Sequence, residues 1–179
     1  MKQQSFALLF ALFLSIGCNN VKEESKEEKP KQESKSTLPR ATMVKKDSLS
    51  TAEAVKLAEA QFGKYLPKML EANNAYPDSQ DTFTGDFTGD GIADIAIYFS
   101  LAPKEGGNTI VAQGLALYQN NGTTVKVIAG FEPNYLFSFT KIEKGKIYIE
   151  KLAYADTDGR CCPSIKTDHI LTIAGNTVY

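Results

Sequence analysis

The sequence contains no tryptophan and a single histidine, His169, among its 179 residues. Histidine is the side chain that most often transfers protons near neutral pH, so this scarcity removes much of what acid–base catalysis needs. The His-Glu-x-x-His, Gly-x-Ser-x-Gly, phosphate-loop and dinucleotide-binding motifs are also missing. The sequence therefore favours a protein that is not an enzyme.

The chain also lacks an excess of charge and a long apolar run. Its formal net charge is −1, whereas nucleic-acid binders and polybasic membrane binders carry a clear positive excess, so we expect no nucleic-acid partner. The apolar run from Phe6 to Ile16 is too short to cross a bilayer. With Lys2 before it, this run predicts a signal peptide over residues 1–17.

Leu14-Ser15-Ile16-Gly17-Cys18 resembles the lipobox of bacterial lipoproteins, in which a small residue precedes a cysteine. The leucine stands one position further from the cysteine than is usual. The resemblance implies that Cys18 is lipidated and that the mature chain is attached to a membrane through this N-terminal lipid. The alternative is an ordinary secretory peptide followed by a chance cysteine.

Residues 18–48 predict a disordered, charged tether. Residues 19–48 hold eight basic and six acidic side chains and almost no large apolar one, so burial cannot offset the entropy of ordering. Lys22-Glu23-Glu24 is similar to the acidic export signals of lipoproteins on the outer face of the outer membrane. This similarity implies an outer-membrane lipoprotein of the cell envelope, either periplasmic or surface-exposed.

Residues 49–179 predict one domain of the α+β class. Ser50-Thr51-Ala52-Glu53 forms a capping box, and the apolar spacing after it predicts a helix that ends or bends at Gly63. A second short helix is expected over Leu66 to Ala72, with Pro67 in its first turn.

From residue 93 onward the apolar pattern has a period of two, and turn residues separate the runs. Asn120-Asn121-Gly122 and Glu143-Lys144-Gly145 predict hairpin turns. We expect an N-terminal helix packed on an antiparallel meander sheet of about six strands. The expected strands are Ala93 to Phe99, Val111 to Tyr118, Val125 to Ala129, Leu136 to Ile142, Ile147 to Tyr154 and Ile165 to Ile173, with a short segment at Val178 and Tyr179.

Gly85 to Asp94 has the spacing of a calcium loop that leads into a strand. Its side chains and carbonyls offer oxygen ligands at alternate positions, with a glycine at the tight bend. The expected ligands are Asp86, Thr88, Asp90, the Ile92 carbonyl and Asp94. The alternative is a tight turn whose acids are simply solvated.

The same residues resemble the calcium loops of FG-GAP and related repeats, with Thr88 in place of the commoner Asp or Asn. The pattern occurs once, which excludes a propeller, because repeats must stack to bury their faces. In layout, the segment from residue 80 to 179 is similar to small secreted bacterial domains of unknown function. The resemblance implies a bound Ca²⁺ with a structural role.

Cys161 and Cys162 are adjacent, and an exported protein meets an oxidising compartment. Neighbouring Cα atoms are about 3.8 Å apart, below the usual disulfide range, so a vicinal disulfide and two buried thiols both remain open. Asp156-Thr157-Asp158-Gly159 offers either a second cation site or a plain turn. His169 alternates with apolar residues and is expected to be structural.

The sequence identifies no substrate. We expect a non-enzymatic binding or structural domain that contacts a protein, glycan or other ligand through its sheet and loops. Tyrosines on the predicted strands either cover a half-buried face or form an aromatic platform for that ligand. The alternative is a small hydrolase or thiol-redox protein that uses Cys161 and Cys162, with His169 as the partner of Cys162 in a thiol mechanism. The tyrosines concerned are Tyr98, Tyr118, Tyr148 and Tyr154.

Overall fold

The computed structural model describes residues 48–107, 109–159 and 161–179. The predicted signal peptide, Cys18 and all of the predicted tether except Ser48 lie outside these residues. In the part of the chain that is described, no helix is long and apolar enough to span a bilayer.

Helix α1 (Thr51–Ala72) begins at the predicted capping box. The Glu53 amide donates to Ser50 Oγ at 3.3 Å, and the Ser50 amide donates to Glu53 Oε2 at 2.9 Å. The predicted break at Gly63 and the second helix at Pro67 are wrong, because α1 continues through both residues.

The apolar stripe of α1 explains why the helix continues. Ala54, Ala58, Phe62 and Met69 are all buried on one face. Packing of such a face supplies most of the stability of a helix in a folded protein, so it outweighs the unfavourable propensities of one glycine and one proline.

Nine strands follow α1 in the described residues, and all their pairings are antiparallel. Sheet A has the order β1-β2-β3-β4, sheet B has the order β5-β6-β7, and β8 pairs with β9 alone. The bounds are β1 (Ala75–Gly85), β2 (Asp94–Pro103), β3 (Ala112–Asn120), β4 (Val125–Phe131), β5 (Leu136–Glu143), β6 (Lys146–Ala153), β7 (Ile165–Leu171), β8 (Ile173–Ala174) and β9 (Thr177–Val178).

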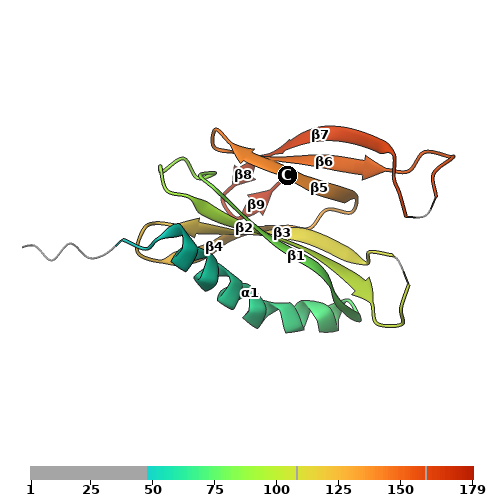
Figure 1. Ribbon diagram of the computed structural model, residues 1–179, viewed down its shortest axis with the longest axis horizontal. Helices are drawn as coiled ribbons and strands as arrows, with labels where there is room; N and C mark the ends of the chain where they lie inside the picture. The colour runs from blue at the N-terminus through green and yellow to red at the C-terminus, as the bar shows by residue number, and fades with distance from the viewer. Residues whose placement is uncertain (1–47, 108, 160) are drawn as a thin grey trace, which may run out of the picture. The chain divides into compact units, whose positions relative to one another are not determined.

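Three layers result, with α1 on one face of sheet A and sheet B on the other (Figure 1). The predicted α+β class and the helix on an antiparallel sheet are confirmed. The single meander of about six strands is wrong, because β5 does not pair with β4. The chain leaves the edge of sheet A at Glu132-Pro133-Asn134 and begins a second sheet that covers the first.

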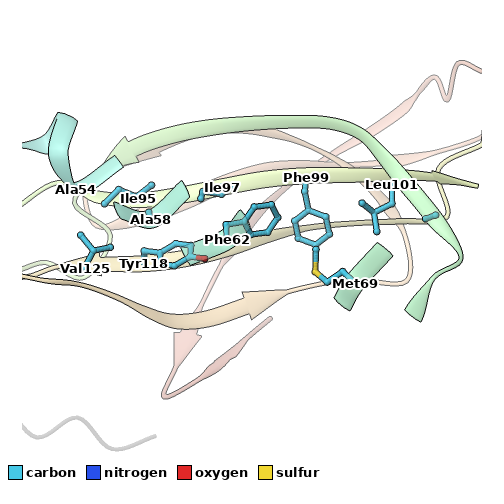
Figure 2. Packing of buried hydrophobic residues seen from close by; sticks show 11 residues of the cluster. Ala54, Ala58, Phe62, Met69, Ile95, Ile97, Phe99, Leu101, Tyr118 and Val125 are labelled. Atoms are coloured by element: carbon cyan, nitrogen blue, oxygen red, sulfur yellow. The ribbon is translucent and has the colours of Figure 1, made fainter. Parts of the chain in front are cut away.

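The first core lies between α1 and sheet A (Figure 2). Ile95, Ile97, Phe99 and Leu101 of β2 project toward the helix, and all four are nearly inaccessible to solvent. The rings of Phe62 and Phe99 pack with their centroids 5.5 Å apart. The predicted period of two in this strand therefore marks the face that meets α1.

The second core lies between the two sheets. Its buried members are Phe87, Ala96, Leu115, Leu117, Ala129, Phe131, Phe137, Ile147, Ile149 and Leu171. Because β2 is covered on both faces, it is buried along almost its whole length.

Strand β1 is absent from the sequence-based expectation. Its 11 residues are mostly exposed, and the register shifts between Pro77 and Ser79. Proline is tolerated at an edge or a bulge of a sheet, and β1 is an edge strand. Pairing with β2 holds β1 in place, and the polar composition of β1 explains why the apolar pattern of the sequence did not predict it.

The two ends of sheet A carry different loops. At one end, the Leu49 amide donates to the Gly122 carbonyl at 2.7 Å, so α1 starts beside the turn between β3 and β4. The loops between β2 and β3 and between β6 and β7 lie at the opposite end (Figure 1).

Candidate functional site

The predicted calcium loop is a compact turn between β1 and β2. Gly89 and Gly91 have φ angles of 80° and 83°, which favour glycine. Asp86 Oδ1 accepts from the Gly89 amide at 2.6 Å, and its Oδ2 accepts from the Gly91 amide at 2.9 Å. Asp90 Oδ1 accepts from the Ile92 amide at 2.9 Å. Two of the expected acidic ligands therefore shape the turn through backbone amides.

Asp94 has a different position, because its side chain is fully buried at the start of β2. Its Oδ2 accepts from the amides of Phe87 and Thr88 at 3.1 and 2.9 Å, and its Oδ1 accepts from the Asn120 amide at 3.1 Å. Hydrogen bonds to an ionised acceptor are stronger than neutral ones. Asp94 therefore holds the loop against the end of β3.

These contacts test how well the loop suits a cation. In the ranges that the structure describes, no three Asp, Glu, His or Cys side chains gather in an arrangement that could hold a metal. A carboxylate offers about four acceptor sites, so the two amides on Asp86 leave room for further bonds. Asp86, Asp90 and the Ile92 carbonyl offer oxygen atoms in the turn, whereas Asp94 accepts from three amides inside the domain. The fit is partial.

A cleft opens between the two sheets at the other end of the domain. Its volume is about 610 Å³. The rings of Phe83 on β1 and Phe139 on β5 stack across the sheets with centroids 3.7 Å apart. The lining residues are Asp81, Phe83, Tyr98, Thr109, Ile110, Gln113, Leu136, Phe137, Ser138, Phe139, Leu152, Tyr154, Cys161 and Pro163.

Gln113 and Tyr98 supply fixed polar groups to this cleft. Gln113 is buried, and its Nε2 donates to the Phe137 carbonyl at 2.7 Å and to Tyr98 Oη at 3.3 Å. Burial raises the pKa of Tyr98, a hydrogen bond with Ser100 partly offsets this rise, and the carboxylates of Asp78 and Asp81 add smaller increases. The Tyr98 phenol therefore stays protonated at neutral pH and keeps a hydrogen to donate.

The two adjacent cysteines form a disulfide in the loop between β6 and β7, and Cys161 lines the cleft. Asp158 closes this loop, since its Oδ2 accepts from the amides of Ala155 and Ser164 at 2.7 and 2.8 Å. These amides also lower the pKa of Asp158. The carboxylate proposed for a second cation site thus stabilises the turn.

His169 lies in the middle of β7, opposite Ile149, and is half-buried. Burial lowers its pKa, and the charge on Lys151 lowers it further. From Ile165, four strand residues cover about 13 Å, which separates His169 from the cysteine loop. No hydrogen bond joins it to Cys162 in the described part of the chain, so the thiol–histidine pair is not assembled here.

Sequence reasoning missed the cleft, together with Asp81 and Gln113. One signal was available for Gln113, because it alternates with Leu115 and Leu117 in the buried pattern of β3. Tyr98 and Tyr154 reach the cleft as an aromatic surface, whereas Tyr118 belongs to the core under α1.

Comparisons with known protein families, with curated proteins and with solved structures found no match to this chain. Any functional argument therefore starts from the geometry of the loop and the cleft.

Proposed function

We propose that this chain is a lipid-anchored protein of the cell envelope whose domain binds a ligand and does not catalyse a reaction. Cys18 carries the lipid and attaches the domain to the outer membrane, on its periplasmic or its outer side. The observation that carries the binding role is the cleft between sheets A and B. Its ligand is a small molecule, a sugar unit of a glycan or a segment of a partner protein.

Three properties of the cleft support this role. Its volume of about 610 Å³ lies within the range of small-molecule sites, about 300 to 1,000 Å³. Its walls are largely aromatic and aliphatic, with few polar groups among them. Gln113 is already held by hydrogen bonds, so less ordering is required when a ligand binds.

The loop from Asp86 to Asp94 completes the proposal as a structural calcium site. Asp86, Asp90 and the Ile92 carbonyl would hold the ion, with Thr88 contributing through its hydroxyl or a water and Asp94 as the inner ligand. The ion would offset the repulsion among three carboxylates in one turn. The cleft lies elsewhere, so calcium would act on stability and not on the ligand directly.

A residue-resolved NMR screen tests the binding role. The processed chain, purified in detergent, is titrated with a library of small aromatic, aliphatic and sugar compounds, and detergent alone is the blank. We expect at least one compound to shift the resonances of cleft residues such as Tyr98 and Gln113.

A pair of variants locates the site. Thr109→Trp places a large ring at the mouth of the cleft and should weaken binding about tenfold or more by excluding the ligand. Thr123→Trp, in the turn between β3 and β4, is the matched control and should bind normally. Equal binding by wild type and Thr109→Trp, or a screen with no shift at the cleft, would overturn the proposal.

A further inference from the structure

The cleft has an unbalanced charge. Of the described residues that line it, Asp81 alone carries a formal charge at neutral pH. Asp81 is exposed, and within the described ranges no hydrogen bond or ion pair engages its carboxylate. The cleft therefore presents one carboxylate with spare acceptor sites to an incoming ligand.

The register of β1 places Asp81 on the face of sheet A that meets sheet B. It pairs directly with Tyr98 of β2, so both side chains project from the same face, toward the cleft. The negative charge of Asp81 also makes a small contribution to the raised pKa of Tyr98, after burial and the opposing hydrogen bond with Ser100.

Asp78 strengthens the negative potential at this end of β1 and β2. Its Oδ2 accepts from the Ser100 hydroxyl at 2.7 Å, and Ser100 pairs with Ser79 across the sheet. Neither partner is a cation, so the charge of Asp78 is not neutralised by this contact. Asp81 lines the cleft and Asp78 lies outside its lining, and no described lining residue is basic.

The apolar walls define the other half of the recognition. Phe83 and Phe139 form a stacked pair in the wall of the cleft, and Leu136 and Leu152 add aliphatic surface. Aromatic faces attract a cation as well as an apolar ring, because the ring quadrupole is negative on its face. The aromatic walls and the carboxylate therefore both favour a cation, and they disfavour an anion.

We propose that the cleft binds small organic cations, in which an aromatic or aliphatic body lies against Phe83 and Phe139 and an ammonium group pairs with Asp81. This inference rests on the proposed binding role and narrows it to one ligand class. Tyr98 adds a neutral hydroxyl beside the ammonium, and Cys161 at the rim adds a further apolar contact.

Three probes of nearly equal size test the charge preference. These are 2-phenylethylammonium, 2-phenylethanol and 3-phenylpropionate, titrated into the processed chain at pH 7 with residue-resolved NMR shifts as the readout. We expect the ammonium to bind about fivefold more tightly than the alcohol and the carboxylate to bind most weakly. Added salt should reduce the difference by screening.

Asp81→Asn keeps the shape of the side chain and removes its charge. In this variant the ammonium should lose most of its advantage over the alcohol, and only the smaller attraction of the aromatic faces should remain. Asp168→Asn, on exposed strand β7, is the matched control and should retain the preference.

The outcomes separate the two proposals. If the carboxylate binds in the cleft as tightly as the ammonium, or if Asp81→Asn keeps the full preference for the ammonium, the cation inference is wrong and the binding role stands. If none of the three probes nor any library compound shifts the cleft resonances, the binding role itself is wrong, and the cation inference falls with it.

Discussion

The side-chain amide of Gln113 on β3 donates to the backbone carbonyl of Phe137 on β5 at 2.7 Å, and the Phe137 amide donates back to Gln113 Oε1 at 3.4 Å. Both residues are buried. This reciprocal pair joins sheet A to sheet B through hydrogen bonds, in a core that otherwise consists of apolar contacts. It also sets the spacing of the sheets beside the cleft.

Gln113→Leu should destabilise the domain by about 1 to 3 kcal/mol, because the buried carbonyl and amide of Phe137 lose their partner. The free energy of unfolding in urea measures this change. Gln80→Leu, at an exposed position of β1, is the matched control and should stay within about 0.5 kcal/mol of wild type. Equal stability of the two variants would show that apolar packing alone holds the sheets together.

Gly114→Ala should destabilise the domain by about 1 to 3 kcal/mol through overpacking. A Cβ at this position would lie 2.5 Å from the Phe131 carbonyl oxygen and 2.8 Å from Phe99 Cζ. Gly130→Ala is the control on the neighbouring strand, since its Cβ would have no atom within 4 Å. Thermal unfolding of both variants tests the difference, and a stable Gly114→Ala would contradict the close approach of β3 and β4.

Calcium should raise the melting temperature at millimolar concentration. Extracellular sites have dissociation constants of about 0.1 to 1 mM, so 10 mM calcium should stabilise by about 1.4 to 2.7 kcal/mol. Magnesium should do so much less, because it demands a tighter octahedral geometry. The measurement is a melting curve of the chelated chain with and without each ion.

Asp90→Ala should remove the calcium response while the domain still folds, since β1 to β4 and α1 supply its core. Asp168→Ala, at an exposed position of β7 outside the loop, should respond as wild type does. Identical melting curves for the wild-type chain in chelator and in calcium would show that the loop is only a turn.

Cys18→Ser should abolish lipidation, because the thiol is the attachment point that the lipobox resemblance implies. Incorporation of labelled fatty acid and membrane fractionation in the producing cell measure this loss. Cys161→Ser is the control and should be labelled normally. Normal labelling and fractionation of the Cys18 variant would refute the anchor.

Replacing Cys161 and Cys162 together by Ala should leave the fold intact and weaken ligand binding in the cleft about two- to fivefold, because Cys161 forms part of its rim. Melting curves and the NMR titration measure the two effects. Mass spectrometry after differential alkylation reports the redox state of the wild-type pair. If the variant folds but loses a turnover that the wild type shows with dithiols or ester substrates, the enzyme alternative is correct.

Local signals in the sequence predicted the start of α1, the course of β2 and the two hairpin turns. The capping box at Ser50 and the apolar spacing after it act within a few residues, so they can be read without the fold. The positive φ angles of Gly122 and Gly145 occur where the hairpin turns were expected. The helix end was wrong because the packing of Met69 against β2 and its neighbours lies outside any local pattern.

The division into two sheets was not predictable from periodicity. An inward face repeats every second residue whether it meets a helix or another sheet, so β5 to β7 look like a continuation of β4. The cleft depends on the division into two sheets. Asp81 reaches the cleft only because the register between β1 and β2 places it opposite Tyr98. Asp94 was expected as a metal ligand, and its three amide partners became visible only with the fold.

The hydrogen bond from Leu49 to Gly122 places the start of α1 at the end of the domain that carries the turn between β3 and β4. A Cβ at Gly122 would lie 3.3 Å from Ile92 Cδ1, so Leu49 and Gly122 lie next to the loop of Asp86 to Asp94. The loops between β2 and β3 and between β6 and β7 lie at the opposite end (Figure 1), and Thr109 and Cys161 of these loops line the cleft. A label or tag attached at Ser48 should therefore leave the cleft open to a ligand.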